Sequence, residues 1–323
     1  MEANPDLYAK LEDLRRQINY HNYLYHVQDA PVISDYEYDR LLQELKQIEA
    51  EHPEWITPDS PTQRAGSRPS EKFAKVRHPA PIISLANAFS PAEIRAWYER
   101  NLRIDERMEK TDYVVEPKID GLSVVLHYQD GVFVQGATRG DGEIGEDITP
   151  NLRTIRALPL RIPVDQDGPK PPARFVVRGE AYMNVKDFEA LNQRLTEAGE
   201  KPYLNPRNTA AGSLRQLDPK LTASRPLNLL MYQVVVADGP TPQTQWELLK
   251  YLRKMGFPVT TAARYCPDLE SAIQSCLDGG ALRDELPFEV DGMVIKVNDL
   301  RLARDLPAQA GATSAGLMDE IDL

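Results

Sequence analysis

The chain has 323 residues, which is enough for two domains rather than one small core. Hydrophobic residues make up 41% and charged residues 27%, and no apolar run approaches the roughly 18 residues of a membrane span. We therefore expect a globular protein with no membrane partner. The net charge of -11 argues against a stand-alone clamp on duplex DNA, because such surfaces carry an excess of Lys and Arg.

The N-terminus and the cysteines bear on the compartment. The opening segment MEANPDLYAKLEDLRRQ is charged almost at once and lacks the apolar stretch of a signal peptide, which predicts a cytoplasmic protein. Two cysteines, Cys266 and Cys276, are too few for a disulfide framework or a four-cysteine zinc site. We therefore expect reduced thiols and no zinc.

Two helices are predicted in the N-terminal part of the chain. The first covers residues 5–27, with leucines at helical spacing, and Ala30-Pro31 comes after it as a helix breaker. Ser34 begins the second helix, and Glu37 completes a capping box three residues later. This helix has one apolar stripe and ends near His52-Pro53.

A loop-like stretch at residues 57–69 separates the two helices from the rest of the chain. It contains four residues that break regular structure, namely Pro58, Pro61, Gly66 and Pro69. We therefore place a domain boundary near residue 73, with a small all-helical module at 1–72 and a larger domain at 73–323.

Beyond this boundary the pattern changes to short strands paired through turns. A helix begins at Ser90, with Pro91 at its first position and Glu93 closing a capping box. Asn184 is expected to cap a helix that ends at Gly199. Another helix is expected from Gln245 to Met255, and strands are expected at 113–117, 122–128, 132–138, 175–183, 227–236 and 290–298. Because helices and strands do not alternate, the pattern predicts an α+β fold on mostly antiparallel sheets.

Residues 140–145 fit the G-x-G-x-x-G pattern of dinucleotide-binding loops. In that fingerprint the loop must begin a helix whose N-terminus binds the pyrophosphate. Here Asp141, Glu143, Glu146 and Asp147 crowd the loop with negative charge, and Pro150 would interrupt a helix directly after it. We therefore reject a Rossmann domain.

A stronger candidate is the segment EPKIDG at 116–121. Lys118 ends a predicted strand, and Asp120 lies two residues further on the same side. Alone this pattern is weak, because a lysine at a strand end is usually a solvated surface residue. Three more segments come after it in order, and they strengthen it: ATRGDG at 137–142, VRGE at 177–180 and VDGMVIK at 290–296.

These four segments resemble, in sequence and order, the nucleotidyltransferase motifs of DNA ligases. NPRNTAAGSLRQLD at 205–218 is similar to a segment of the NAD-dependent branch of that family. YLYHVQDAPVISDYEYDRL at 23–41 is similar to the N-terminal module of that branch, which holds the nicotinamide mononucleotide (NMN) half of NAD. The resemblance, which runs from about residue 7 to about 314, implies a bacterial NAD-dependent DNA ligase with a DNA-ligase-type nucleotidyltransferase domain.

The resemblance also implies substrates and catalytic roles. NAD would donate AMP, Mg²⁺ would assist, nicked double-stranded DNA would be the family substrate, and a monomer is expected. Lys118 would attack the α-phosphate of NAD and form a phosphoramide with AMP. Because a free lysine has a pKa of about 10.4, burial or a neighbouring cation such as Lys296 would have to lower that pKa. Lys118, Asp120 and Lys296 form the implied catalytic group.

Further residues are implied as ligands. Three carboxylates could hold Mg²⁺, a hard cation that prefers oxygen ligands: Asp120, Glu180 and Asp291. The implied contacts to the adenosine half of NAD are Ser84, Leu85, Glu116, Arg139, Glu180, Arg207, Arg215 and Lys296. The implied contacts to the NMN half are Tyr25, His26, Asp35, Tyr36, Glu37, Tyr38 and Asp39.

The NMN assignment has independent physical support and one alternative. Asp35, Tyr38 and Asp39 stand at i, i+3 and i+4, on one face of the second helix. Aromatic rings beside carboxylates suit a flat, cationic nicotinamide ring. The alternative is a helical hairpin whose tyrosines simply pack between its helices.

The last motif demands an irregular strand. Asp291 and Lys296 are five residues apart, so a regular strand would place their side chains on opposite faces. Both can reach one site only if the strand contains a kink or bulge. We expect it at Gly292.

The C-terminal part departs from the family pattern. Residues 297–323 contain no lysine, although the family has a second essential lysine roughly two dozen residues after the last motif. The sequence becomes atypical from about residue 315, and it does not continue into the OB-fold and later domains of the family. A shortened version of a longer protein, a frameshifted gene and a natural short form stay open. We expect slow or partial self-adenylation without complete nick sealing.

Two other functions compete with this one. An ATP-dependent ligase or capping enzyme shares the lysine motif but lacks the module around Tyr25–Asp39. A catalytically defective relic that binds NAD without transferring AMP stays open as the alternative.

Overall fold

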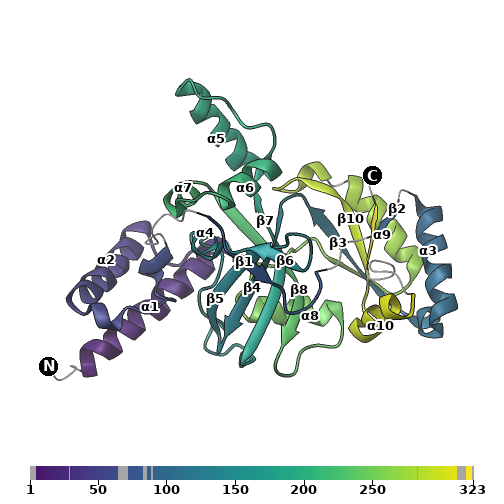
Figure 1. Ribbon diagram of the computed structural model, residues 1–323, viewed down its shortest axis with the longest axis horizontal. Helices are drawn as coiled ribbons and strands as arrows, with labels where there is room; N and C mark the ends of the chain where they lie inside the picture. Colours follow the sequence, from purple (N-terminus) through teal and green to yellow (C-terminus); the bar gives the residue numbers. More distant parts are fainter. Residues whose placement is uncertain are drawn as a thin grey trace.

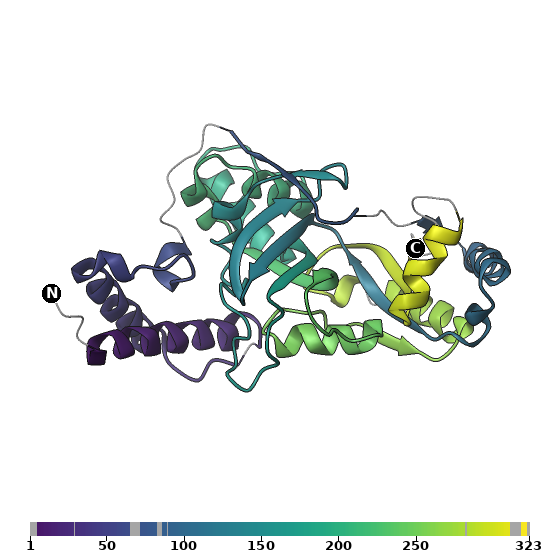
Figure 2. The same ribbon diagram turned by 60° about the horizontal axis from the view of Figure 1, so that its bottom comes forward.

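The structure is a computed structural model that describes residues 5–28, 30–64, 72–82, 86–88, 90–281, 283–310 and 318–321. Figure 1 shows helices α1 (Pro5–His26) and α2 (Asp35–Glu51) at one end of the molecule, the sheets in the middle and helix α3 (Pro91–Ile104) at the other end. The turned view in Figure 2 keeps this order. Within the described residues, no helix is long and apolar enough to cross a membrane.

The N-terminal helices form a small core of their own. Its buried members are Leu11, Leu14, Ile18, Leu45 and Ile48. Ser34 begins α2 with the predicted capping box, because its side chain accepts from the Glu37 amide while the Glu37 side chain accepts from the Ser34 amide. Two short 3₁₀ helices come next, at Pro53–Trp55 and Pro61–Arg64. The predicted helices are thus confirmed, whereas the domain boundary near residue 73 stays a prediction.

A four-stranded antiparallel sheet forms the larger core. Its strand order is β5 (Val132–Thr138), β4 (Leu122–Gln129), β7 (Arg174–Met183) and β8 (Leu227–Ala237). The β4–β5 hairpin turns through Asp130 and Gly131, both with positive φ. The helices of this part are α4 (Thr149–Leu152), α5 (Val185–Glu197), α6 (Pro206–Leu214), α7 (Pro219–Ala223) and α8 (Gln245–Lys254).

A five-stranded sheet forms the second core. Its order is β2 (Ala86–Ala88), β11 (Met318–Ile321), β10 (Val290–Val297), β3 (Tyr113–Ile119) and β9 (Arg264–Cys266). Helices α3, α9 (Leu269–Ala281) and α10 (Leu300–Ala310) pack against it. Its neighbouring strands are antiparallel except for β11 with β2. The predicted α+β class is confirmed.

The remaining elements are short. Strands β1 (Lys75–Arg77) and β6 (Ile144–Glu146) form a two-stranded sheet, and 3₁₀ turns lie at Glu106–Lys110 and Arg283–Glu285. The G-x-G-x-x-G segment leads into β6 and not into a helix. Gly140, at its start, has φ +60°, and a Cβ there would lie 1.9 Å from the Ile144 carbonyl oxygen. The glycines thus permit a tight turn, and rejection of a Rossmann domain is confirmed.

One predicted helix cap is wrong in detail. Asn184 does stand directly before α5, and Gly199 lies just after that helix with φ +73°. However, the Asn184 side chain makes no capping hydrogen bond; its Nδ2 donates instead to Asp187 Oδ2 at 3.1 Å. The Asn184 side chain is therefore bonded to Asp187, in the first turn of α5, and does not cap the helix.

Candidate active site

A pocket of about 890 Å³ lies between the two large sheets. Strands β3 and β10 supply one side of it, and strands β4, β7 and β8 supply another. Residues of α6 and of the 138–146 segment complete the lining. All four sequence motifs therefore contribute residues to one pocket. Their resemblance to nucleotidyltransferase motifs implied such a shared nucleotide site.

Two lysine–carboxylate pairs cross between β3 and β10 in this pocket. Lys118 on β3 lies with its Nζ 2.9 Å from Asp291 Oδ2 on β10. Lys296 on β10 lies with its Nζ 3.0 Å from Glu116 Oε2 on β3. Each strand therefore contributes one cation and one anion.

The predicted bulge makes this crossed pairing possible. The register of β10 against β3 shifts between Val290 and Gly292, so that Ile119 pairs with Val290 and Lys118 with Gly292. The shift gives Asp291 and Lys296 access to the same pocket despite their odd separation. The position expected from the spacing is therefore confirmed.

Glu116 is held from two directions. Besides the Lys296 contact, its Oε1 accepts a hydrogen bond of 2.8 Å from Gln245 Nε2 at the start of α8. The same Gln245 nitrogen donates to the Tyr232 carbonyl oxygen at 2.9 Å. Glu116 and Gln245 are both 3% exposed, so this is an internal network. Sequence reasoning missed Gln245, because it lies 129 residues from Glu116 and outside every motif.

Tyr232 on β8 contacts three charged side chains of the pocket, those of Lys296, Arg178 and Glu180. The Lys296 Nζ lies 4.9 Å from its ring centroid and the Arg178 guanidinium 5.6 Å away. Its hydroxyl donates to Glu180 Oε2 at 3.2 Å. Burial lowers the pKa of Lys296, and the charge of Glu116 opposes that change. Tyr232, too, has no motif that would have predicted it.

Glu180 and Arg178, two residues apart on β7, both line the pocket. Burial raises the pKa of Glu180 to about 7, while the positive charge of Arg178 opposes the rise. Arg178 Nε donates to Ser123 Oγ at 3.0 Å. Near neutral pH, therefore, Glu180 exists in both protonation states.

Asp120 lies next to a cation from α6. The Arg207 Nη1 is 3.2 Å from Asp120 Oδ1 and 3.9 Å from Asp291 Oδ2. The first contact is a charge contact without good hydrogen-bond geometry, since Asp120 Oδ1 has no hydrogen-bond partner within the described part of the chain. Burial, together with the smaller effect of the Asp291 charge, raises the pKa of Asp120.

The expected magnesium ligands do not form a cation site in this arrangement. Asp120, Glu180 and Asp291 all line the pocket. Among the described residues, however, no group of three or more acidic, histidine or cysteine side chains is close enough to hold a metal ion. The guanidinium of Arg207 lies close to a carboxylate oxygen of both Asp120 and Asp291 and supplies a cation there. These residues therefore do not fit a preformed Mg²⁺ site.

The other expected adenosine contacts have mixed outcomes. Arg139 and Arg215 line the pocket, and Arg215 Nε lies 2.9 Å from Glu146 Oε2. Ser84 and Leu85 lie outside the described residues. Lys75 on β1, which was not predicted, also lines the pocket, with its Nζ 3.6 Å from Glu146 Oε1.

A second pocket, of about 600 Å³, lies beside the N-terminal helices. Five of the expected NMN contacts line it: Tyr25, His26, Asp35, Tyr38 and Asp39. Two others do not. Tyr36 is 78% exposed, and Glu37 is engaged in the cap of α2. Neither residue lines the pocket, although Glu37 bonds to Ser34, which does.

The far wall of this pocket comes from the larger domain. It includes Thr154, Arg156 and Ala223, none of which was predicted. Burial, together with the smaller effects of the Arg156 and Arg64 charges, lowers the pKa of His26 to about 4, so His26 is neutral at pH 7. The pocket thus combines acidic side chains of α2 with one arginine, Arg156, more than 100 residues away in the sequence.

Two family profiles match the chain. The NAD-dependent DNA ligase adenylation domain matches residues 70–313, and the DNA ligase-like, N-terminal NAD+-binding domain matches residues 4–66. The chain belongs to the NAD-dependent DNA ligase family. Within this family assignment, the first pocket lies in the adenylation domain, and the second lies between the two matched regions.

Individual relatives agree with the profiles. A DNA ligase of Roseiflexus castenholzii is 53% identical over 93% of this chain and 43% of its own length. A DNA ligase of Chloroflexus aggregans is 51% identical over 93% of this chain and 45% of its own length. The chain therefore spans less than half the length of these ligases.

Among solved structures, a mycobacterial DNA ligase D complexed with ATP and MES aligns with 65% of this chain and 54% of its own. The TM-score is 0.33 and the sequence identity 11%, a likeness too low to support an assignment.

Proposed function

We propose that this chain transfers AMP from NAD to Lys118 and releases NMN, as the first step of sealing a DNA nick. The observation that carries the proposal is the setting of Lys118. Its amine projects into a pocket where Lys296, Arg139, Arg178 and Arg207 surround the space next to it. Such a group of cations suits an anionic phosphate.

The covalent step exchanges one bond at phosphorus for another. The unprotonated Nζ of Lys118 attacks the α-phosphorus of NAD, so an N–P bond forms. The bond from that phosphorus to the oxygen of the NMN phosphate breaks, and NMN leaves with the electron pair. The proton lost from the lysine has an acceptor nearby, because Asp291 Oδ2 lies 2.9 Å from Nζ. Asp291 also stabilises the protonated amine before the reaction, so this pairing must loosen when NAD enters.

The second pocket is proposed to hold the NMN half. The carboxylates of Asp35 and Asp39 and the ring of Tyr25 line it together. A cationic nicotinamide ring is attracted by both kinds of group. His26 adds no charge of its own there at neutral pH, since its pKa is about 4.

The wider assignments are proposals of the same kind. We propose nicked double-stranded DNA as the substrate of the complete protein, with a monomer in the cytoplasm. Mg²⁺ is proposed as a requirement of the reaction on the chemistry of the phosphates alone. No residue is assigned to it, because the carboxylates of the pocket do not form a site for it.

Intact mass spectrometry tests the proposal. The chain is incubated with NAD and Mg²⁺, and an increase equal to one AMP is expected. Lys118→Ala and Lys118→Arg should both abolish the adduct, the latter because a guanidinium stays protonated. Lys250→Arg, at an exposed lysine outside both pockets, is the matched control and should retain it.

Other outcomes separate the alternatives. An adduct that survives either substitution of Lys118 would overturn the assignment of the nucleophile. An adduct formed from ATP instead of NAD would indicate an ATP-dependent enzyme. Binding of NAD without any adduct would favour a catalytically inactive relic.

A further inference from the structure

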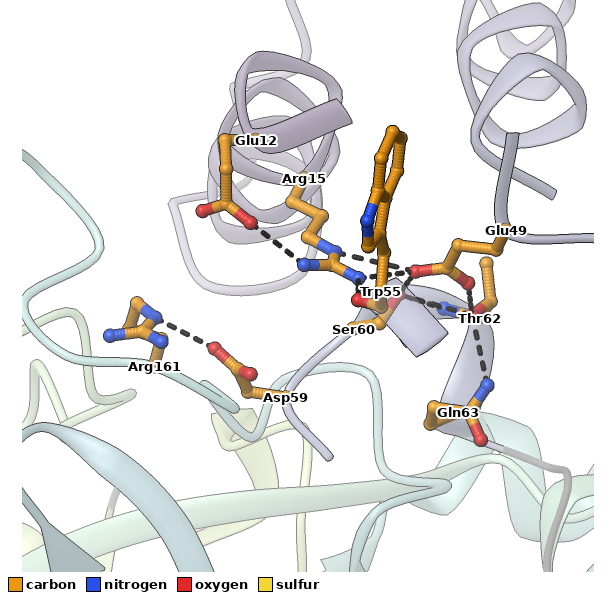
Figure 3. A network of polar contacts seen from close by, with 9 residues as sticks. All are labelled: Glu12, Arg15, Glu49, Trp55, Asp59, Ser60, Thr62, Gln63 and Arg161. Carbon is orange, nitrogen blue, oxygen red and sulfur yellow. Dashed lines mark hydrogen bonds and ion pairs between the residues drawn. The ribbon is translucent and has the colours of Figure 1, made fainter. Parts of the chain in front are cut away.

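Residues Asp59–Arg64 form a strap between the N-terminal helices and the adenylation domain. Ser60 Oγ donates to Glu49 Oε1 at 2.6 Å, and Thr62 Oγ1 donates to Glu49 Oε2, so both contacts tie the strap to α2. Asp59 lies toward the other domain, where its Oδ2 is 2.7 Å from Arg161 Nε. Figure 3 shows these contacts on opposite sides of the strap.

The attachment to α2 is rigid, because Glu49 is itself buried and fully engaged. Arg15 Nη2 lies 2.7 Å from Glu49 Oε1 and also donates to the Trp55 carbonyl oxygen at 2.7 Å. Figure 3 shows Arg15 between Glu12 and Glu49. Arg15 and Glu49 are 5% and 3% exposed. A buried, hydrogen-bonded ion pair fixes the geometry of the groups around it.

Arg64 makes the decisive contact at the other end of the strap. Its Nη1 donates to the carbonyl oxygens of Arg153 at 3.2 Å and Ile155 at 2.9 Å. Its Nη2 donates to the carbonyl oxygen of Leu158 at 3.0 Å. One planar guanidinium therefore holds three carbonyls of the segment 153–158, which contains Thr154 and Arg156. Both of these residues line the second pocket.

We propose that Arg64 is a positioning residue that assembles the second pocket from two domains. By fixing the backbone on either side of Thr154 and Arg156, it holds them across the pocket from Asp35 and Asp39. The ligand class is a mononucleotide with a cationic ring and a phosphate, so the inference rests on the proposed use of this pocket for NMN. Arg64 itself also lines the pocket, and both of its terminal nitrogens are engaged with the backbone of segment 153–158, through which it acts.

Lysine cannot replace Arg64 in this role. The three carbonyls are reached from two nitrogens held apart in a rigid plane, whereas a lysine has a single nitrogen on a flexible chain. Arg64→Lys therefore preserves the positive charge but removes the geometry, which makes it the most informative variant.

The test measures binding of NMN and of AMP to the full chain by isothermal titration calorimetry. Arg64→Lys should weaken NMN binding at least tenfold and change AMP binding less than twofold, because AMP is proposed to bind in the first pocket. Asp59→Asn should weaken NMN binding by a smaller factor, since it loosens the strap but keeps Arg64. Arg95→Lys is the matched control, at an exposed arginine paired with Glu270, and should change neither affinity by more than twofold.

The outcomes separate the inference from the function on which it rests. Unchanged NMN binding by Arg64→Lys would overturn the inference, as would parallel loss of NMN and AMP binding in a variant that circular dichroism shows to be folded. If circular dichroism shows that Arg64→Lys is unfolded, the Asp59→Asn variant tests the inference instead. Unchanged NMN binding by Asp59→Asn would then overturn it. Failure of the wild-type chain to bind NMN overturns the inference. A wild-type chain that binds NMN but forms no AMP adduct overturns only the proposed reaction.

Discussion

Lys296 and Glu116 form an ion pair with Nζ 3.0 Å from Oε2, and both side chains are less than 10% exposed. Removing one partner of a buried pair leaves the other charge uncompensated, which costs about 3–5 kcal/mol. Lys296→Met should therefore lower the free energy of unfolding by that amount in urea titrations. The exposed pair Lys250–Glu247 is the control, and Lys250→Met should change stability by less than about 0.5 kcal/mol. Equal effects of the two substitutions would contradict the buried pairing.

Glu180 should make stability fall as pH rises toward neutrality. Its pKa is raised by burial from an ordinary value of 4.5 to about 7. The folded state therefore holds this proton more tightly than the unfolded state does. The resulting stabilisation is fully present below pH 4.5 and is lost as pH rises to about 7. The free energy of unfolding, measured at pH 5 and pH 8, should fall more between these values in the wild type than in Glu180→Gln. A wild type and variant with the same pH dependence would rule out this role.

Tyr25 and Tyr36 offer a matched pair for the second pocket. Both are exposed tyrosines, but only Tyr25 lines the pocket. Tyr25→Ala should raise the NAD concentration for half-maximal adenylation at least tenfold, because it removes an aromatic contact to the nicotinamide ring. Tyr36→Ala should change it less than twofold. If Tyr36→Ala has the larger effect, the proposed orientation of NMN is wrong.

Glu37 should matter for stability rather than for NAD. Its Oε2 accepts from the Ser34 amide at 2.9 Å, at the positive end of the α2 dipole. Glu37→Ala should lower the free energy of unfolding by roughly 0.5–1 kcal/mol and leave the half-saturating NAD concentration unchanged. Glu51→Ala, at the opposite end of the same helix, should be neutral or stabilising in the same urea titration. A large rise in the half-saturating NAD concentration for Glu37→Ala would instead indicate that Glu37 contacts NAD.

Sequence reasoning succeeded where local periodicity or motif order carried the information. The bulge at Val290–Gly292 was predicted from the odd separation of Asp291 and Lys296, and the register shift confirms it. The cap at Ser34 was predicted from the three-residue spacing between Ser34 and Glu37 in a capping box. Both features depend on residues that are close in the chain.

The sequence failed where a side chain binds a distant backbone or where one polar group competes with another. Arg64 contacts carbonyl oxygens 89 to 94 residues away, and a carbonyl has no signature in a sequence. Asn184 stands at the expected N-cap position, but its side chain makes no capping hydrogen bond, and its Nδ2 donates to Asp187 Oδ2 instead. The proximity of Arg207 on α6 to Asp120 and Asp291 was likewise not predictable from the spacing of the motifs.

Because of the crossed lysine–carboxylate pairs of β3 and β10, an anion that binds in the first pocket must replace a carboxylate that is already paired with a lysine. Lys118 and Lys296 are already neutralised by Asp291 and Glu116, so a phosphate can gain their charge only if it competes with those carboxylates. The free energy of anion binding is then the small difference between the energy of the lysine–phosphate pair and that of the lysine–carboxylate pair. Because the number of paired charges changes little on binding, the affinity of this pocket for AMP should vary less with salt concentration than its count of cationic side chains suggests.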